Sequence, residues 1–119
     1  METWALLGGR LMGTHILLSL YGISFGFLDD EHSIRELFNR VSEAMGATVL
    51  NRFCYKFQPQ GVTVVYTLAE SHISLHSFPE DGSVAIDCYT CGAMDSKKGA
   101  QMFIDYFNPV EISMQEINR

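Results

Sequence analysis

The chain has 119 residues, a length that fits one domain built around a single hydrophobic core. Hydrophobic residues make up 47% of it and charged residues 18%, and these proportions exclude an intrinsically disordered chain. The formal net charge of −6 argues against a nucleic-acid partner, because no basic stripe is present to neutralise phosphates.

The start of the chain, from Trp4 to Met12, is apolar but is interrupted by two glycines and an arginine. It is too short to span a membrane and has no clear cleavage site, so we expect neither a signal peptide nor a membrane anchor. The three cysteines, an odd number, favour free thiols in a reducing cytoplasm over a disulfide framework. We therefore expect residues 1–119 to form one cytoplasmic domain.

The first predicted elements are a strand and a helix. Residues 14–21 alternate between apolar and mostly polar side chains, which predicts a strand with two different faces. Residues 22–28 predict a loop. Asp29 or Asp30 then caps a helix that Gly46 closes. The apolar stripe of this helix consists of Ile34, Leu37, Phe38, Val41 and Met45.

The middle of the chain predicts four short strands. They are rich in β-branched and aromatic residues and cover residues 48–57, 62–68, 72–78 and 84–89. Proline and glycine mark the turn at residues 59–61 and the turn at residues 78–82. Because the connections are short, we expect neighbouring strands to be antiparallel.

The last predicted elements are a helix over residues 97–107, which Asn108-Pro109 ends, and a strand that begins at Val110. The order β-α-β-β-β-β-α-β, with one apolar stripe on each helix, predicts helices on only one face of the sheet. The expected fold is an α/β (α+β) two-layer sandwich, a mostly antiparallel sheet with two helices on one face.

Strand parity separates two chemically different faces. Ile73, Leu75 and Ile86 share the face expected under the helices. The opposite face carries His72, Ser74, His76, Phe78, Asp87, Tyr89 and, if the strand extends that far, Cys91. Such a face is too aromatic to be left bare, and a second identical sheet is its simplest cover. We expect a homodimer with sites near its interface.

The stretch from Leu68 to Cys91 holds most of the groups that can do chemistry. Cys88-x-x-Cys91 could be half of a zinc site or a redox pair, but a second ligand pair is missing and the cysteines do not begin a helix. A hydrolase built on Ser71 would need a nucleophile elbow, which is absent. No metal site is therefore predicted. The remaining possibility is that Ser71, His72 and His76 are only polar residues on a strand face.

The full order of features resembles the small prokaryotic S-adenosylmethionine decarboxylases, which are pyruvoyl-dependent and made as proenzymes. The resemblance covers nearly the whole chain at consistent spacing. The matching segments are Gly13-Thr14-His15, Lys56-Phe57, residues 59–63, Glu70-Ser71-His72, His76, Phe78-Pro79-Glu80 and Thr90-Cys91-Gly92.

This resemblance implies that the chain cuts itself between Glu70 and Ser71, giving residues 1–70 (the β chain) and 71–119 (the α chain). The Ser71 hydroxyl would attack the carbonyl of Glu70, and β-elimination would leave a pyruvoyl group at the start of the second fragment. His76 matches the processing base. Thr63 matches its helper hydroxyl, which is usually a serine in relatives.

The resemblance also implies the catalytic roles. The pyruvoyl ketone would form a Schiff base with the amine of S-adenosylmethionine and act as electron sink during decarboxylation. The product would be the aminopropyl donor for polyamine (spermidine) biosynthesis. Cys91 matches the general acid that protonates the α-carbon. Phe57 and Phe78 match the aromatic residues that sandwich adenine, and Glu80 matches a carboxylate that binds ribose hydroxyls. His15, Ser74, Asp87 and Tyr89 are expected to support geometry and not to react.

One departure bears on the substrate. Ser19 stands where relatives usually carry an acidic residue that suits a cationic part of the substrate. This leaves two alternatives open: a pyruvoyl-dependent decarboxylase of another amino acid, such as ornithine or arginine, and a non-processing homologue that acts as a binding or regulatory subunit.

Overall fold

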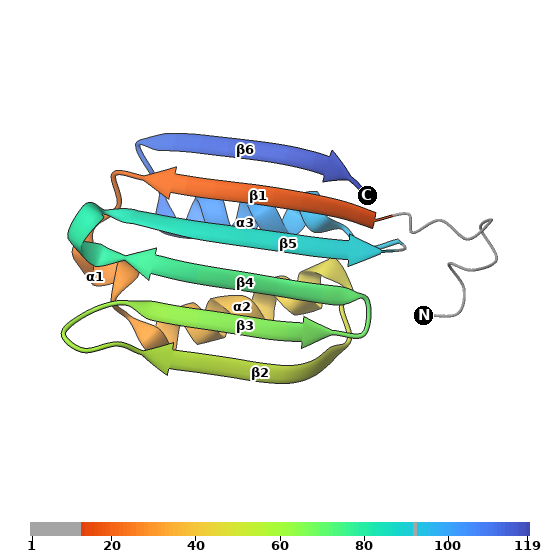
Figure 1. Cartoon of the computed structure of the whole chain (residues 1–119), viewed down its shortest axis with the longest axis horizontal. Coiled ribbons are helices and arrows are strands. Elements are labelled where there is room, and N and C mark those ends of the chain that lie inside the picture. Colours follow the sequence, from red (N-terminus) through yellow and green to blue (C-terminus); the bar gives the residue numbers. More distant parts are fainter. Residues whose placement is uncertain (1–12, 92) are drawn as a thin grey trace.

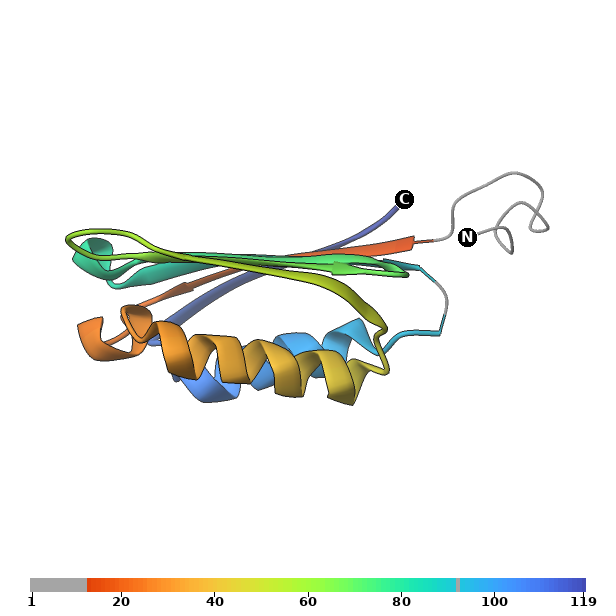
Figure 2. The ribbon, with the colours of Figure 1, turned by 90° about the horizontal axis from the view of Figure 1, so that it is seen from below.

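The computed structural model describes residues 13–91 and 93–119 as a six-stranded antiparallel sheet with helices against one face (Figures 1 and 2). The strand order across the sheet is β2-β3-β4-β5-β1-β6. The strands are β1 (Gly13–Tyr21), β2 (Val49–Lys56), β3 (Val62–Leu68), β4 (Ser71–Phe78), β5 (Ser83–Cys91) and β6 (Glu111–Asn118). The predicted antiparallel two-layer sandwich is confirmed. The N-terminal segment from Trp4 to Met12 lies outside the described residues.

Three α-helices lie on the same side of the sheet in Figure 2: α1 (Phe25–Leu28), α2 (Glu31–Met45) and α3 (Ser96–Phe107). The two predicted helices are α2 and α3, and α1 is an additional single turn inside the expected loop. A single turn, closed by the Asp29 N–H on the carbonyl of Phe25, is too short to show helical periodicity in the sequence. The turn after β4 includes a 3₁₀-helix, η2 (Pro79–Asp81), ended by Gly82 in the left-handed conformation.

The long helices begin and end at the signals that the sequence carries. The Asp30 side chain accepts a hydrogen bond from the Ser33 N–H at the start of α2, and Gly46 ends that helix with φ 78°. Asp95 caps α3 in the same way through the Lys98 N–H. The whole predicted stripe of α2 is buried. Within the described part of the chain, no helix is long and apolar enough to cross a membrane.

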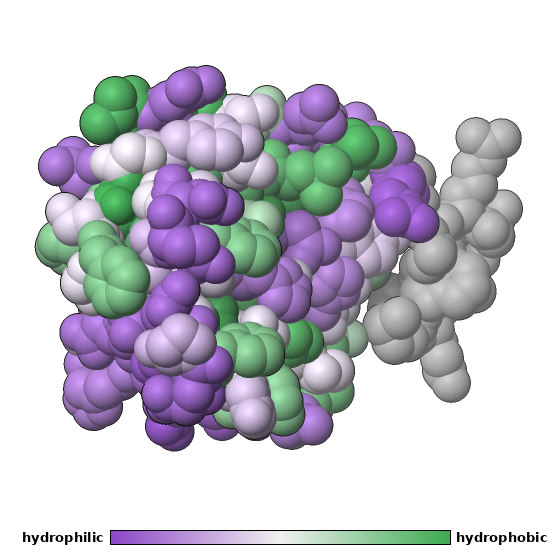
Figure 3. Space-filling view, turned by 60° about the vertical axis from the view of Figure 1, so that its left-hand side comes forward, coloured by the Kyte–Doolittle hydropathy of each residue, from purple (hydrophilic) through white to green (hydrophobic). Residues whose placement is uncertain are grey.

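The core lies between these helices and one face of the sheet. Ile73 and Leu75 of β4 and Ile86 of β5 are buried there, as strand parity predicted. The opposite face, which we call the open face, is covered by none of the helices formed by residues 13–91 and 93–119 (Figure 2). Its exposed aromatic residues include Phe53, Tyr55, Phe57 and Phe78. Figure 3 shows hydrophobic side chains among hydrophilic ones at the end of the molecule that holds the β2–β3 connection.

Candidate active site

The peptide bond between Glu70 and Ser71 lies at the tight connection between β3 and β4, and two hydrogen bonds to Glu70 hold it in place. The Glu70 carbonyl oxygen accepts a hydrogen bond from the Cys91 N–H at 3.2 Å. The Glu70 side chain accepts a second one from the Thr48 N–H at 3.1 Å. Ser71 has φ 151°, a conformation that residues with a Cβ rarely adopt. In general such backbone strain costs about 1–3 kcal/mol. We call Glu70, Ser71 and Cys91 the cleavage end of the sheet.

A second group of predicted site residues lies at the other end of the same strands. The Thr63 hydroxyl and the His76 Nδ1 form a hydrogen bond of 2.9 Å between β3 and β4. Phe57 is 45% and Phe78 is 42% exposed, and Glu80 is exposed in η2. We call these five residues the aromatic end.

The loop that carries Phe57 is fixed by a network around Asp29. The Asp29 carboxylate accepts the Gly61 N–H at 2.8 Å and pairs with the Lys56 ammonium at 3.0 Å. The Gly61 hydrogen bond is the main reason that the pKa of Asp29 lies below its ordinary value. The Lys56 ammonium also donates to the Phe57 carbonyl at 2.9 Å. These contacts fix the loop that places Phe57 at the aromatic end.

The two ends do not meet within one chain. Ser71 pairs with Leu68 and His76 with Thr63 in the β3–β4 ladder, so Ser71 and His76 are five residues apart on one extended strand. At about 3.3 Å per residue this is a separation of roughly 16 Å, well beyond hydrogen-bond reach. Figure 1 shows the same separation: the β3–β4 connection lies at the right and the end of β4 at the left.

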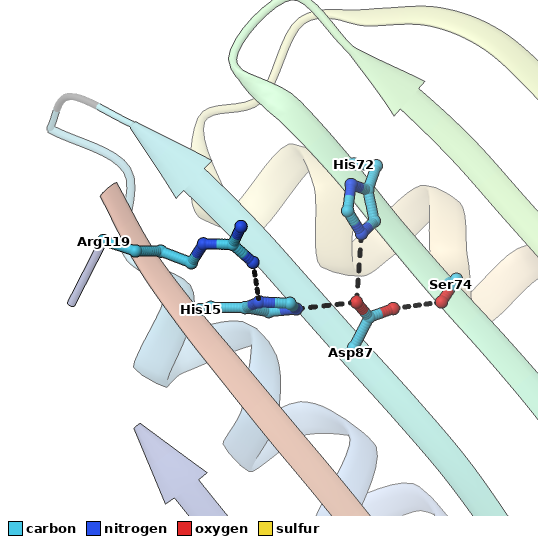
Figure 4. Close-up of polar contacts among 5 residues, drawn as sticks. All are labelled: His15, His72, Ser74, Asp87 and Arg119. Carbon is cyan, nitrogen blue, oxygen red and sulfur yellow. Dashed lines mark hydrogen bonds and ion pairs between the residues drawn. The ribbon is translucent and has the colours of Figure 1, made fainter. Parts of the chain in front are cut away.

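A polar network stands on the open face near the cleavage end, drawn in Figure 4. The Asp87 Oδ2 accepts hydrogen bonds from the Nε2 atoms of His15, at 2.7 Å, and His72, at 3.0 Å. The Ser74 hydroxyl donates to the other oxygen of Asp87. Arg119 Nη1 lies 3.5 Å from the Nδ1 of His15. Since a guanidinium can only donate, His15 accepts at Nδ1 and carries its proton on Nε2, toward Asp87.

Asp87 is ionised in this network. Burial would raise the pKa of its carboxyl, but the hydrogen bonds from Ser74, His72 and His15 outweigh burial and lower the pKa below its ordinary value. The sequence placed Asp87, His72 and Ser74 on one face. It gave no sign that β1 lies beside β5 and brings His15 to the same carboxylate.

The three cysteines are free and separate. Cys88 is buried under the helices, where burial raises the pKa of its thiol to about 12. Burial also raises the pKa of the Cys54 thiol, to about 11. Cys91 follows three residues after Cys88 and lies half-buried on the open face, at the end of β5. The two cysteines of the Cys-x-x-Cys motif therefore lie on opposite faces of the sheet.

The structure thus groups the predicted site residues in two sets, one at each end of the sheet. It adds two contacts that the sequence analysis missed, from Cys91 and from Thr48 to Glu70. Both donors are backbone N–H groups, which every residue except proline carries, so the sequence could not predict these contacts. The last residue of the Thr90-Cys91-Gly92 motif lies outside the described residues.

Comparison with known proteins gives a consistent result. The family model described as S-adenosylmethionine decarboxylase matches residues 14–119. The chain is 45% identical over 94 residues to S-adenosylmethionine decarboxylase proenzyme 2 of Bacillus cereus, covering 79% of this chain and 74% of that protein. It is 42% identical over 94 residues to the proenzyme of Brevibacillus brevis, covering 79% and 68%.

Solved structures agree with the sequence matches. The crystal structure of the adenosylmethionine decarboxylase from Aquifex aeolicus superposes with a TM-score of 0.85 at 37% identity, covering 93% of this chain and 92% of that one. A Trypanosoma brucei AdoMetDC monomer has a TM-score of 0.63 at 12% identity over 85% of this chain and 44% of its own, which is a likeness of fold. The family match and the proenzyme relatives decide the assignment: the chain belongs to the S-adenosylmethionine decarboxylase family.

Proposed function

We propose that this chain is a self-processing, pyruvoyl-dependent decarboxylase of S-adenosylmethionine that makes the aminopropyl donor for spermidine biosynthesis. The observation that carries the proposal is the arrangement at Glu70 and Ser71, where a strained serine follows a carbonyl already bound by the Cys91 N–H. The free thiols support the reducing cytoplasm as its compartment.

The processing chemistry follows from these contacts. The Ser71 hydroxyl attacks the carbonyl carbon of Glu70, and the Cys91 N–H stabilises the charge that develops on its oxygen. The peptide C–N bond breaks, the amine regains a proton, and an ester links the two residues. Loss of the Ser71 α-proton then expels Glu70 as a carboxylate and leaves dehydroalanine. Water hydrolyses this to the keto group and ammonia, and the strain at Ser71 is released.

The groups around Ser71 fit the pyruvoyl group that the family uses. Once formed, this group is an electron sink that accepts the electron pair left by departing carbon dioxide. Cys91 lies beside it, because its N–H contacts the residue before Ser71 and its thiol is half-buried on the open face. The thiol supplies the proton that the substrate α-carbon takes up after decarboxylation.

The separation of the two ends supports a homodimer. The base His76 on β4 and its helper Thr63, paired with it on β3, are too far from Ser71 to reach that residue in their own chain. If two open faces pack with two-fold symmetry, the aromatic end of one protomer lies over the cleavage end of its partner, and two complete sites form. This arrangement also covers the exposed aromatic residues.

The aromatic end supports the choice of substrate. Phe57 and Phe78 flank Gly61 at the same end of the sheet, since the Phe57 N–H donates to the Gly61 carbonyl and β3 pairs with β4 there. Two strand spacings separate the flanking strands by about 9–10 Å, which leaves room for a flat base between two rings. The exposed Glu80 carboxylate follows Phe78 and suits ribose hydroxyls.

The substrate test compares three compounds in parallel. Purified, processed protein should release carbon dioxide from S-adenosylmethionine and not from ornithine or arginine, because neither amino acid fills the aromatic end. Release is followed with carboxyl-labelled substrate. Release from ornithine or arginine alone would overturn the substrate assignment and point to Ser19, which is half-buried on the open face between Ala85 and Ser113.

The Cys91→Ala variant tests the proton donor. The backbone N–H that contacts Glu70 remains, so the chain should still be cut at Ser71. Decarboxylation should fall about 10²- to 10⁴-fold, the range for removal of a general acid. Cleavage is read by gel and mass spectrometry, and turnover by carbon dioxide release. Cys54→Ala, which removes a half-buried thiol between β2 and α2, is the matched control. Equal turnover in the two variants would reject the role of Cys91.

A further inference from the structure

His72 is the residue directly after the cleavage point, and its side chain is tied to another strand. Its ring donates from Nε2 to the Asp87 Oδ2 at 3.0 Å, from β4 to β5. The Asp87 side chain is only 25% exposed, so this charge-assisted contact is partly shielded from water. His72 is therefore anchored by its side chain as well as by the sheet ladder.

This anchor matters more after cleavage than before it. In the uncut chain, Ser71 is held on one side by Glu70, which contacts Cys91 and Thr48. After cleavage Glu70 belongs to the other fragment, so its contacts no longer hold Ser71, which becomes the first residue of its own fragment. Terminal residues fray unless they are tied down. The nearest side-chain tie is that of His72 to Asp87.

Asp87 is itself held in one orientation. Its other oxygen accepts the Ser74 hydroxyl, and the oxygen that receives His72 also accepts His15 at 2.7 Å. His15 is fixed in turn by Arg119, at 3.5 Å, and by the Tyr89 ring, whose centroid lies 5.3 Å from its own. The Asp87 carboxylate is therefore held in a fixed orientation from which it can position the His72 ring.

His15, His72 and Asp87 are also residue types that can ligate a divalent transition metal. Their ligating atoms lie within 4.8 Å of one another. A ligating histidine usually donates its other ring N–H to an acceptor. The second ring nitrogen of His15 instead faces the cationic Arg119, which opposes a bound cation. The contacts favour a hydrogen-bonded anchor, and a metal becomes an outcome of the test.

We infer that Asp87 is a positioning residue that acts through His72 to hold the keto group formed from Ser71 in its reactive place. The inference rests on the proposed function. It separates two steps that share the same residues. During cleavage Ser71 is covalently linked to both Glu70 and His72, and during turnover it is linked to His72 alone.

The experiment compares Asp87→Asn with Asp105→Asn, which removes the same charge from α3 on the other side of the sheet. Asp87→Asn should lower kcat about 10- to 100-fold, the range for a misplacement of up to about 1 Å. KM should change little, because the aromatic end is untouched. The rate of proenzyme cleavage should fall much less than kcat. Cleavage is timed by gel, and kcat and KM are measured on fully cleaved protein.

A second pair of variants keeps the test valid if Asp87→Asn does not fold. His72→Gln places an amide donor near the position of Nε2 and should retain much more turnover than His72→Ala. Equal kcat in Asp87→Asn and Asp105→Asn would overturn the inference, as would equal losses of cleavage and turnover, which indicate a general structural defect. Loss of wild-type turnover in EDTA that zinc restores would replace the anchor with a metal site. A wild-type chain that neither cuts itself nor releases carbon dioxide would contradict the proposed function itself.

Discussion

The Ser71→Ala variant should remain one uncut chain and release no carbon dioxide from S-adenosylmethionine. Alanine keeps the backbone but lacks the oxygen that attacks the Glu70 carbonyl, so neither the ester nor the keto group can form. The contacts of Glu70 to Cys91 and Thr48 do not involve the Ser71 side chain and should persist. Wild-type protein should appear as residues 1–70 and 71–119, with the second fragment blocked at its amino terminus. Intact-mass spectrometry distinguishes the two results directly.

The matched control is Ser113→Ala, which removes the hydroxyl of an exposed serine on β6. It should be cut and should turn over like the wild type. Cleavage of Ser71→Ala at the same bond, or decarboxylation by the uncut variant, would contradict the proposed origin of the cofactor. A wild-type chain that stays whole after long incubation would favour the alternative of a non-processing binding subunit.

Mixing two inactive variants should restore cleavage if the active site is shared between protomers. Ser71→Ala lacks the nucleophile, and His76→Ala lacks the base. In a mixed dimer, the His76→Ala chain still has Ser71 and receives His76 from its partner, so one of the two sites is complete. Co-expression with different tags should give cleavage of the His76→Ala chain alone, in about half of its molecules if the chains pair at random.

The control pairs His76→Ala with a chain that carries both substitutions, so that no copy of His76 is present in the dimer. It should show no cleavage. If His76 served the Ser71 of its own chain, the first mixture would fail as well, because no single chain in it has both residues. The roughly 16 Å along β4 between these residues predicts the opposite. Failure of the mixture would require a large rearrangement of that strand.

Much of this fold could be predicted because alternation along a strand assigns every second residue to one face. Ile73 and Leu75 are buried, and His72 and His76 stand on the open face, as that alternation requires. The place of β1 between β5 and β6 could not be predicted, since no short turn connects β1 to either strand. The bond between His15 and Asp87 depends on this neighbourhood and was therefore invisible in the sequence.

The candidate site was predictable only in part, for a related reason. The resemblance assigned Ser71, His76 and Cys91 to one site, but it gave no information about the distances between these residues in a single chain. The register of β3 and β4 shows that His76 lies well away from the other two. The short helix α1 was missed because one helical turn leaves no periodic pattern.

The proposed cut in the β3–β4 hairpin would divide the sheet into two fragments that remain paired through shared strand ladders. The first fragment would carry β1, β2 and β3, and the second would carry β4, β5 and β6. Three of the five strand ladders, β1–β5, β1–β6 and β3–β4, then join the two fragments. The two fragments would stay associated without a covalent link, and unfolding would become a dissociation. The melting temperature of the mature protein would accordingly rise more steeply with concentration than that of the uncut dimer, because a mature dimer unfolds to four chains and an uncut dimer to two.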